Sequence, residues 1–488
     1  MMSNGIRRSF AFSAVERYAS IAVSFVTSII LSRLLTPQDF GIFSIAMSFV
    51  ILADIFREFG TGNYLVQVKQ LTDQHLRTAF TTLFATSALC ALVILVGMPF
   101  IAEWYDDARF RQLMPLFAVN MLLGPFGLPS RSLLLRDLSF DILAGISLLG
   151  TAIYLVVVVG LALLGHGVMS LAWAALASTA SGVLMGWVVR PCFTAFRVSL
   201  RGWREPFEFG TVSTATAILN VFYEHLPQLI IGRSIGLAAV GLFGRAASLC
   251  QLPDRLVISA FSPVLLPALS RQTQAGVDLK PSYLLALSHM SALQWPILLC
   301  LALLAEPAVL ILYGEQWKEV APLVRIMALA ALAMFPAFMT YPTLVALGRV
   351  RDTLWMSLIS LPPSMLLILV ASPFGLETVA ATQLVTAPMQ VFVAVSFIGR
   401  RIGVSWADIA AAVWRSIVVA ICSSAVPALV IVLQGGFSFS ISHSALALAL
   451  AGAAAGWLVG LLLSGHPLRE ELWNGTEFVG RRLRRWSS

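Results

Sequence analysis

Ionisable side chains inside long apolar stretches are the residues of this sequence that point most directly to chemistry. Three of them are arginines, Arg17, Arg245 and Arg255. A charge at the centre of a membrane span costs about 2.5–3.5 kcal/mol on insertion scales, so such a residue faces a cavity or a partner. A guanidinium group binds phosphate oxygens in bidentate fashion. Each arginine is therefore a candidate for holding an anion, and Arg17 and Arg245 are the first two choices.

Acidic residues and one histidine lie in the same apolar stretches: Glu16, Asp54, Glu224, His225 and Asp254. A carboxylate buried there has a raised pKa and can carry a proton, so these residues are candidates for lining a cavity or coupling transport to protons.

Each candidate also has a structural alternative. Arg17 can pair with Glu16 or reach the inner interface, and Arg245 can form a salt bridge inside its own helical bundle. Asp254 and Arg255 flank each other beside Pro253 and can pair locally. Glu224 and His225 can provide a hydrogen bond that holds two helices together.

Catalytic and cofactor motifs are absent. None of the three lysines follows a glycine, which excludes a P-loop, and no HExxH or GxSxG sequence occurs. The six histidines are dispersed and the five cysteines form no CxxC pair, so we expect neither a metal site nor a cofactor. The sequence predicts a protein that is not an enzyme.

The composition identifies the elements that must position these residues. Hydrophobic residues make up 58 % of the 488 residues, charged residues make up 11 %, and the mean hydropathy is +0.87. A soluble domain has about 25 % charged residues, so a soluble enzyme and a disordered protein are excluded. The apolar residues come in blocks of about 20, which favours membrane-spanning helices over the alternating strands of a barrel.

We therefore predict an all-α, polytopic membrane protein with about fourteen transmembrane helices. The long eighth block contains Pro253, which predicts a kink. The blocks are roughly 10–33, 40–57, 78–102, 112–130, 142–164, 168–189, 208–232, 239–266, 283–304, 320–346, 353–371, 377–398, 409–433 and 442–463.

The placement of lysine and arginine predicts the orientation. With a cytoplasmic N-terminus, 22 of the 32 basic residues fall on the cytoplasmic side, six fall on the outer side and four lie inside spans. This split predicts cytoplasmic N- and C-termini. The net charge of +8 therefore reflects topology and does not indicate nucleic-acid binding. The basic run 481–486 suits contact with anionic membrane lipids.

The sequence contains an internal repeat with an offset of 200 residues. Residues 30–54 match residues 230–254 at eight of 25 positions without a gap. Because the offset corresponds to six spans, both copies have the same orientation, related by an axis along the membrane normal. We predict an N-lobe of helices 1–6 (residues 1–204) and a C-lobe of helices 7–12 (205–402). Two extra helices (403–464) and a cytoplasmic basic tail (465–488) follow.

The repeated segments resemble those of a known family. The stretch from Ser32 to Gly41, Phe59-Gly60, and the stretch from Gly241 to Ala246 followed by Leu252-Pro253 are similar to bacterial polysaccharide transporters. These are the Wzx-like lipid-linked oligosaccharide flippases of the multidrug/oligosaccharidyl-lipid/polysaccharide exporter (MOP) superfamily. The resemblance is most specific over residues 1–80 and 205–272.

The resemblance implies a V-shaped pair of lobes, as in MATE and MurJ transporters. It implies a substrate of undecaprenyl diphosphate carrying an oligosaccharide, moved across the bacterial cytoplasmic membrane by alternating access. The pathway would be that of an exopolysaccharide, a lipopolysaccharide or a capsule. A diphosphate carries at least two negative charges, which gives Arg17, Arg245 and Arg255 their expected role. A polymerase and glycosyltransferases of the same pathway would be its protein partners.

Two other functions stay open. One is a lipid II flippase or a cation-coupled drug exporter of the same superfamily, although fourteen spans and cationic intramembrane residues argue against a drug exporter. The other is a polysaccharide polymerase or ligase. The outer loops are only about 4 to 15 residues long, which leaves little room for such chemistry.

Overall fold

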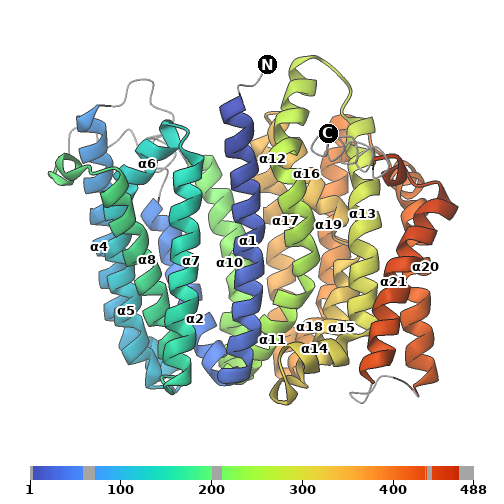
Figure 1. Ribbon diagram of the computed structural model, residues 1–488, viewed down its shortest axis with the longest axis horizontal. Helices are drawn as coiled ribbons and strands as arrows, with labels where there is room; N and C mark the ends of the chain where they lie inside the picture. Colours follow the sequence, from blue (N-terminus) through green and yellow to red (C-terminus); the bar gives the residue numbers. More distant parts are fainter. Residues whose placement is uncertain (1–3, 59–71, 200–210, 435, 437–441, 472–488) are drawn as a thin grey trace, which may run out of the picture. The chain divides into compact units, whose positions relative to one another are not determined.

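The computed structural model describes residues 4–58, 72–199, 211–434, 436 and 442–471. Within these residues every regular element is a helix (Figure 1). Side chains are described from residue 18 onward, except over 58–71, 200–217, 257–266, 435, 437–441 and 472–488. The chain divides into two compact units, residues 1–244 and 245–488.

The first unit consists of long helices joined by short turns and two 3₁₀ segments. They are α1 (Asn4–Leu34), α2 (Pro37–Glu58), α4 (Asp73–Trp104), α5 (Arg109–Leu123), η1 (Gly124–Gly127), α6 (Leu128–Arg136), α7 (Phe140–Leu163), α8 (Met169–Val189), η2 (Phe193–Phe196), α10 (Thr211–Ser234) and the beginning of α11 (Leu237–Cys250).

The second unit begins inside α11 and has a similar number of elements. They are α12 (Leu252–Gln274), α13 (Lys280–Leu303), α14 (Ala305–Leu312), η3 (Glu315–Trp317), α15 (Val320–Ala331), α16 (Phe335–Ala346), α17 (Val350–Ala371), η4 (Ser372–Phe374), α18 (Leu376–Ala381), α19 (Gln383–Ile402), α20 (Trp406–Leu433) and α21 (His443–Ser464).

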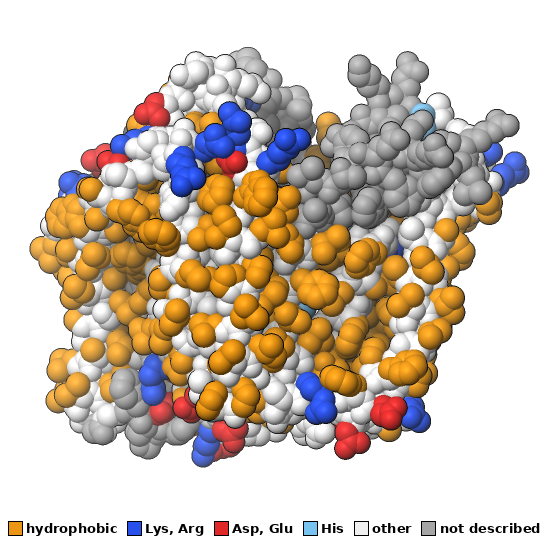
Figure 2. Space-filling model, turned by 180° about the vertical axis from the view of Figure 1, so that it is seen from behind, with side chains coloured by type: hydrophobic (Ala, Val, Ile, Leu, Met, Phe, Trp, Pro, Cys, Tyr) orange, Lys and Arg blue, Asp and Glu red, His pale blue; other side chains and the backbone are white. Residues whose placement is uncertain are grey.

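Each of the fourteen predicted apolar blocks coincides with a helix or with consecutive helices. Ten helices of the described chain are long and apolar enough to cross a membrane, and the bent pair α15–α16 makes eleven. The tenth block is that pair, bent by 51°. On the face in Figure 2, hydrophobic side chains cover the middle of the helices, whereas charged side chains gather toward their ends. These features establish a multi-pass helical membrane protein, and the number fourteen stays a prediction.

The eighth block is interrupted where a kink was predicted. Helix α11 ends at Cys250 and α12 begins at Leu252, with Pro253 in its first turn. Proline is tolerated there because the first helical N–H groups have no intrahelical acceptor. The predicted boundary between the lobes, 204/205, lies outside the described residues, as does most of the predicted tail, and this division stays a prediction.

The repeated segments form a reciprocal close contact in the first unit. A side chain on Gly41 of α2 would overlap the carbonyl oxygen of Leu237, and one on Gly241 of α11 would overlap the carbonyl oxygen of Pro37. The two contacts are equivalent, because Gly41 corresponds to Gly241 and Pro37 corresponds to Leu237 under the 200-residue offset. Only glycine permits so close an approach of two backbones. A reciprocal contact of this kind is the signature of a local two-fold relation between the two segments.

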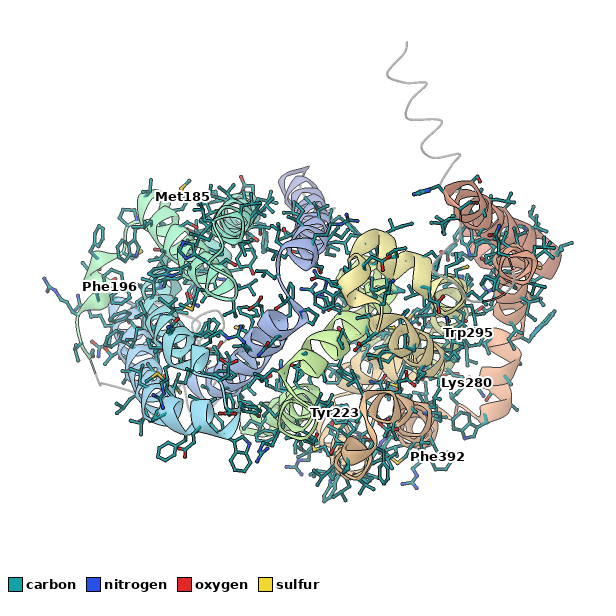
Figure 3. All side chains as sticks on the ribbon, turned by 90° about the horizontal axis from the view of Figure 1, so that it is seen from below. Met185, Phe196, Tyr223, Lys280, Trp295 and Phe392 are labelled. Carbon is teal, nitrogen blue, oxygen red and sulfur yellow. The ribbon has the colours of Figure 1, made fainter. Side chains whose placement is uncertain are left out.

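Buried side chains hold the second unit together. Seen along the helices in Figure 3, Trp295 of α13 lies inside this unit, where its Nε1 donates to the carbonyl oxygen of Leu332 at 2.8 Å. His466, which is fully buried, lies 3.0 Å from Ser288 Oγ and 3.1 Å from Ser416 Oγ through its Nε2. Burial lowers the pKa of His466 to about 4. The ring is therefore neutral near pH 7 and joins the end of α21 to α13 and α20.

Candidate functional site

Glu16 and Arg17 lie on α1, within a 31-residue helix. Their side chains fall outside the described residues. The anion-binding role of Arg17 therefore stays a prediction.

Asp54 lies near the end of α2, where it pairs with an arginine one turn away. Its Oδ1 is 2.8 Å from Nε of Arg57, and the two side chains are 38 % and 15 % exposed, respectively. The ion pair directs the Asp54 side chain toward Arg57 and orients the guanidinium of Arg57, which is mostly buried. Arg57 is one of the 22 basic residues that the predicted orientation places on the cytoplasmic side.

Glu224 and His225 lie on α10 and have different surroundings. Glu224 is exposed, whereas His225 is half-buried with its Nδ1 3.3 Å from Ser48 Oγ of α2. Ser48 Oγ is also 3.0 Å from Oε1 of Gln228. This contact joins α2 to α10 in the first unit, as the structural alternative for His225 anticipated.

Arg245 is buried among aromatic rings of the second unit. Only 9 % of the residue is exposed, and its guanidinium carbon lies 5.6 Å from the ring centre of Tyr313 and 5.8 Å from that of Trp317. Cation–π contacts of this kind stabilise a buried guanidinium. They supply a packing role for Arg245, and its predicted role in binding diphosphate is untested.

Asp254 and Arg255 take separate partners. Asp254 Oδ1 accepts a hydrogen bond from Nε2 of Gln294, which is buried on α13. Arg255 is exposed and its Nη2 donates to Oε1 of Gln251 at 3.0 Å, one turn earlier. The structure therefore links Asp254 to the core of the second unit.

A cavity of about 720 Å³ lies inside the first unit and was not anticipated from the sequence. Helices α2, α4, α6, α7 and α8 and the segment η1 all contribute to its wall. Its cationic side chains are Arg57 and Arg131. Its hydroxyl-bearing residues are Ser147, Thr151, Ser178 and Thr179. The spacing Gly182-xxx-Gly186 on α8 was a sequence signal for close helix packing here.

Glycines shape this cavity. The nearest atom to a side chain built on Gly124 would be Nη1 of Arg57, at 2.7 Å. The Arg57 guanidinium therefore lies against bare backbone of η1. Gly150 similarly faces Ser178 Oγ, which would be 3.2 Å from an added carbon and donates to the Gly150 carbonyl oxygen at 2.9 Å.

Aromatic rings brace the wall of the cavity. Phe126 of η1 contacts Phe80, Trp187 and Phe196 with ring centres 5.4, 6.3 and 5.5 Å apart. Trp187 Nε1 also donates to the Phe126 carbonyl oxygen at 2.9 Å. Phe196 lies at the margin of the first unit in Figure 3. The cluster holds η1 against α8. Its members Phe126 and Trp187 are next in sequence to Gly127 and Gly186, which line the cavity.

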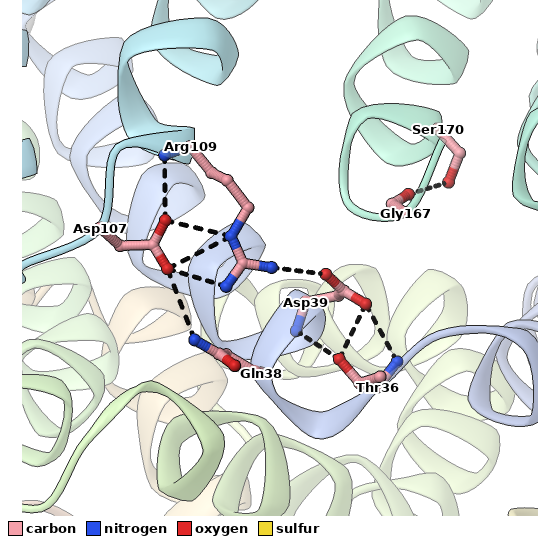
Figure 4. A network of polar contacts seen from close by, with 7 residues as sticks. All are labelled: Thr36, Gln38, Asp39, Asp107, Arg109, Gly167 and Ser170. Carbon is pink, nitrogen blue, oxygen red and sulfur yellow. Dashed lines mark hydrogen bonds and ion pairs between the residues drawn. The ribbon is translucent and has the colours of Figure 1, made fainter. Parts of the chain in front are cut away.

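A polar network closes the other end of the first unit (Figure 4). Arg109 Nη1 donates to Asp39 Oδ1 at 3.0 Å and its Nη2 donates to Asp107 Oδ2 at 2.8 Å. Thr36 and Asp39 exchange hydrogen bonds at the start of α2. Burial alone would raise the pKa of the Asp107 carboxyl, but the hydrogen bonds and charge of Arg109 hold it below its usual value.

The family profile described as "polysaccharide biosynthesis protein" matches residues 30–322 of the chain. The match spans more than half of the sequence and includes both repeated segments. The chain belongs to the polysaccharide biosynthesis protein family.

Two curated relatives carry more specific names. The succinoglycan biosynthesis transport protein ExoT of Rhizobium meliloti is 25 % identical over 354 residues, which cover 72 % of each chain. The lipopolysaccharide biosynthesis protein WzxC of Escherichia coli is 21 % identical over 323 residues, which cover 66 % of each chain.

Solved structures show the fold of this family member. A lipid II flippase MurJ in an inward closed conformation matches with a TM-score of 0.74 over 92 % of this chain and 98 % of that chain, at 12 % identity. An inward-facing MATE transporter of the MOP superfamily matches with a TM-score of 0.60 over 80 % of this chain and 98 % of that chain, at 14 % identity. The fold is therefore MurJ- and MATE-like, as the resemblance implied.

Proposed function

We propose that this family member is a flippase that moves undecaprenyl-diphosphate-linked oligosaccharide repeat units across the bacterial cytoplasmic membrane. The repeat units would serve exopolysaccharide, lipopolysaccharide or capsule biosynthesis. The observation that carries the proposal is the family match over residues 30–322. The names of ExoT and WzxC, which refer to succinoglycan transport and lipopolysaccharide biosynthesis, support the transport of saccharide repeats.

The proposed mechanism is alternating access, without a catalytic step by the chain itself. The parallel repeat and the reciprocal Gly41 and Gly241 contact support it, because duplicated helical bundles related by an axis along the membrane normal can rock against each other. Arg17, Arg245 and Arg255 would bind the diphosphate, while Glu16, Asp54, Glu224, His225 and Asp254 would line the path or carry protons. Glycosyltransferases and a polymerase of the pathway would be the partners.

Deleting the gene and analysing the lipid-linked saccharides tests this function. We expect one repeat unit to accumulate on undecaprenyl diphosphate in the inner leaflet, together with loss of the surface polysaccharide. Expression of the wild-type chain should restore the polysaccharide. Normal surface polysaccharide in the deletion strain would refute the proposal.

Arg17→Ala tests the diphosphate role within that assay. We expect export to be lost at normal abundance in the membrane, because a charge-assisted hydrogen bond contributes about 1.5–3 kcal/mol. Arg17→Lys should restore little if bidentate geometry is required. A parallel fall in abundance and export would instead assign Arg17 a structural role.

The orientation can be measured separately. Reporters fused after Arg204 and after Arg485 should both lie in the cytoplasm, and a reporter near Asp106 should lie outside it. Opposite compartments for the first two would refute cytoplasmic N- and C-termini.

The fold likeness to MurJ supports a second candidate, lipid II flipping. Expression of the chain in a strain depleted of its own MurJ distinguishes the two. We expect that the chain does not restore growth. Restored growth, together with normal surface polysaccharide in the strain that lacks this gene, would favour lipid II as the substrate.

A further inference from the structure

The cavity of the first unit lies toward one end of its helices. Arg57 is in the last turn of α2, Phe140 begins α7, and Gly186 is in the last turn of α8. Helices α2, α6 and α8 end on this side of the unit and α4 and α7 begin there, and the lining extends from these helix ends to Thr151 and Ser178 in the middle of α7 and α8. In the predicted orientation this side carries most lysines and arginines and is cytoplasmic.

The lining of the cavity suits an anion. Arg57 and Arg131 contribute two permanent positive charges, and no Asp or Glu is among the residues that line it in the described chain. Asp54 engages Nε of Arg57, while Nη1 lies over Gly124 in the cavity wall. Arginine presents several N–H donors in a planar fork, which matches phosphate oxygens.

The rest of the lining suits an amphiphile that carries polar groups beside its anion. Thr151 Oγ1 donates to the Ser147 carbonyl oxygen and Ser178 Oγ donates to that of Gly150, so both oxygens keep lone pairs for a ligand's hydroxyl groups. The apolar residues of the wall include Leu134, Leu143 and Val183. A volume of about 720 Å³ is within the range of small-ligand sites, which is roughly 300–1,000 Å³.

We propose that this cavity binds the phosphate-bearing headgroup of an anionic amphiphile from the cytoplasmic side, with Arg57 and Arg131 as its cationic ligands. This proposal rests on the proposed function only for the identity of the amphiphile, which we expect to be a prenyl diphosphate. Phospholipid headgroups have the same phosphate chemistry. Phe126 of η1 and Trp187 of α8 contact each other next to the residues that line the cavity, which holds η1 against α8.

Binding to the purified full-length protein in detergent tests the proposal. The probes are farnesyl diphosphate, inorganic pyrophosphate and phosphatidylglycerol. We expect farnesyl diphosphate to bind more tightly than pyrophosphate, because the apolar wall contacts the prenyl chain. If phosphatidylglycerol displaced bound farnesyl diphosphate at a concentration below that of the farnesyl diphosphate, a phospholipid would be identified as the source. Pyrophosphate binding as tightly as farnesyl diphosphate would overturn an amphiphile site.

Two variants alter the cavity in different ways. Arg131→Gln removes an exposed charge and should weaken farnesyl diphosphate binding by roughly 10-fold or more, the loss expected for one charge-assisted hydrogen bond. Gly182→Leu fills the cavity without changing charge and should also weaken binding. The nearest atom to a carbon added on Gly182 is 4.0 Å away, and leucine favours a helix over glycine, so this variant should fold.

Matched variants control for charge and size. Arg136→Gln removes a charge from the same helix, α6, and Gly160→Leu adds the same side chain to an open position on α7, and neither residue lines the cavity. Both should bind farnesyl diphosphate as the wild type does. Unchanged binding by Arg131→Gln and Gly182→Leu, or equal losses in the controls, would overturn the site. Because binding is measured on purified protein, this failure is distinguishable from a failure of the export assay.

Discussion

The two copies of the internal repeat, residues 30–54 and 230–254, have kept their backbone contact and changed their polar chemistry. Gly41 and Gly241 make the same approach to each other's segments. By contrast, Asp39, which binds Arg109, corresponds to Ala239 in the second copy. Duplication has therefore preserved the positions where only one residue fits.

Equivalent positions also differ in the kind of side chain that they bury. Ile45 in the first copy is fully buried, whereas its counterpart Arg245 is stacked on Tyr313 and Trp317. Asp54 pairs with Arg57 on its own helix, while Asp254 binds Gln294 on another. Sequence identity between the copies therefore does not imply equivalent roles, even for the shared aspartate.

The largest effect should come from breaking the shared contact. Gly41→Ala and Gly241→Ala each place a methyl group on a backbone carbonyl that cannot move like a side chain, so we expect a loss of about 3 kcal/mol or more. Abundance in the membrane and thermal unfolding in detergent measure it. Gly160→Ala, which meets open space, should be neutral or slightly stabilising. If only one of the two substitutions lowered stability, the two halves of the contact would not contribute equally to stability.

The next effect concerns the buried arginine of the second copy. Arg245→Ala removes two cation–π contacts, so we expect a loss of about 1–3 kcal/mol in stability. Export should fall further than abundance in the membrane, because the proposed diphosphate ligand is lost as well. Arg245→Lys should recover only part of the stability, because an ammonium lacks the planar stacking surface. Arg271→Ala, at an exposed position of α12, serves as control and should leave stability and export unchanged. Export that falls only in step with abundance in Arg245→Ala would assign Arg245 the packing role alone.

A smaller effect is expected at the serine that both copies share. Ser48→Ala removes the hydroxyl that contacts His225 and Gln228, which should cost about 1 kcal/mol in thermal stability. Ser248→Ala, at the half-buried equivalent position, should change stability by less than about 0.5 kcal/mol. Equal losses would show that the two serines have kept one role.

The smallest effect is a pH dependence of the network that contacts the first copy through Asp39, a residue that the second copy lacks. Arg109 holds the pKa of Asp107 below its ordinary value of about 3.9, so this carboxyl stabilises the folded state above that pH and loses its contribution as the pH falls through the folded value. The thermal unfolding temperature should therefore fall less steeply between pH 6 and pH 3 in Arg109→Gln than in the wild type. Parallel curves would contradict this assignment.

The sequence by itself determined the class of protein, the helices and the repeat. Blocks of about 20 apolar residues admit only helices in a membrane, because every backbone polar group must be satisfied within its own segment. The sequence also placed the break near Pro253, since proline at an interior position removes a hydrogen bond. The resemblance carried by the repeated segments led to the family.

Only the tertiary structure decided what the charged residues contact. Arg57 and Arg131 are 74 residues apart, and the cavity that they line exists because η1, α7 and α8 pack around glycines. Likewise, Arg245 is buried because Tyr313 and Trp317, which are 68 and 72 residues further along the chain, pack against it. Helix formation depends on the composition of a segment, which the sequence states. The surroundings of a side chain depend on long-range packing, which composition and periodicity do not specify.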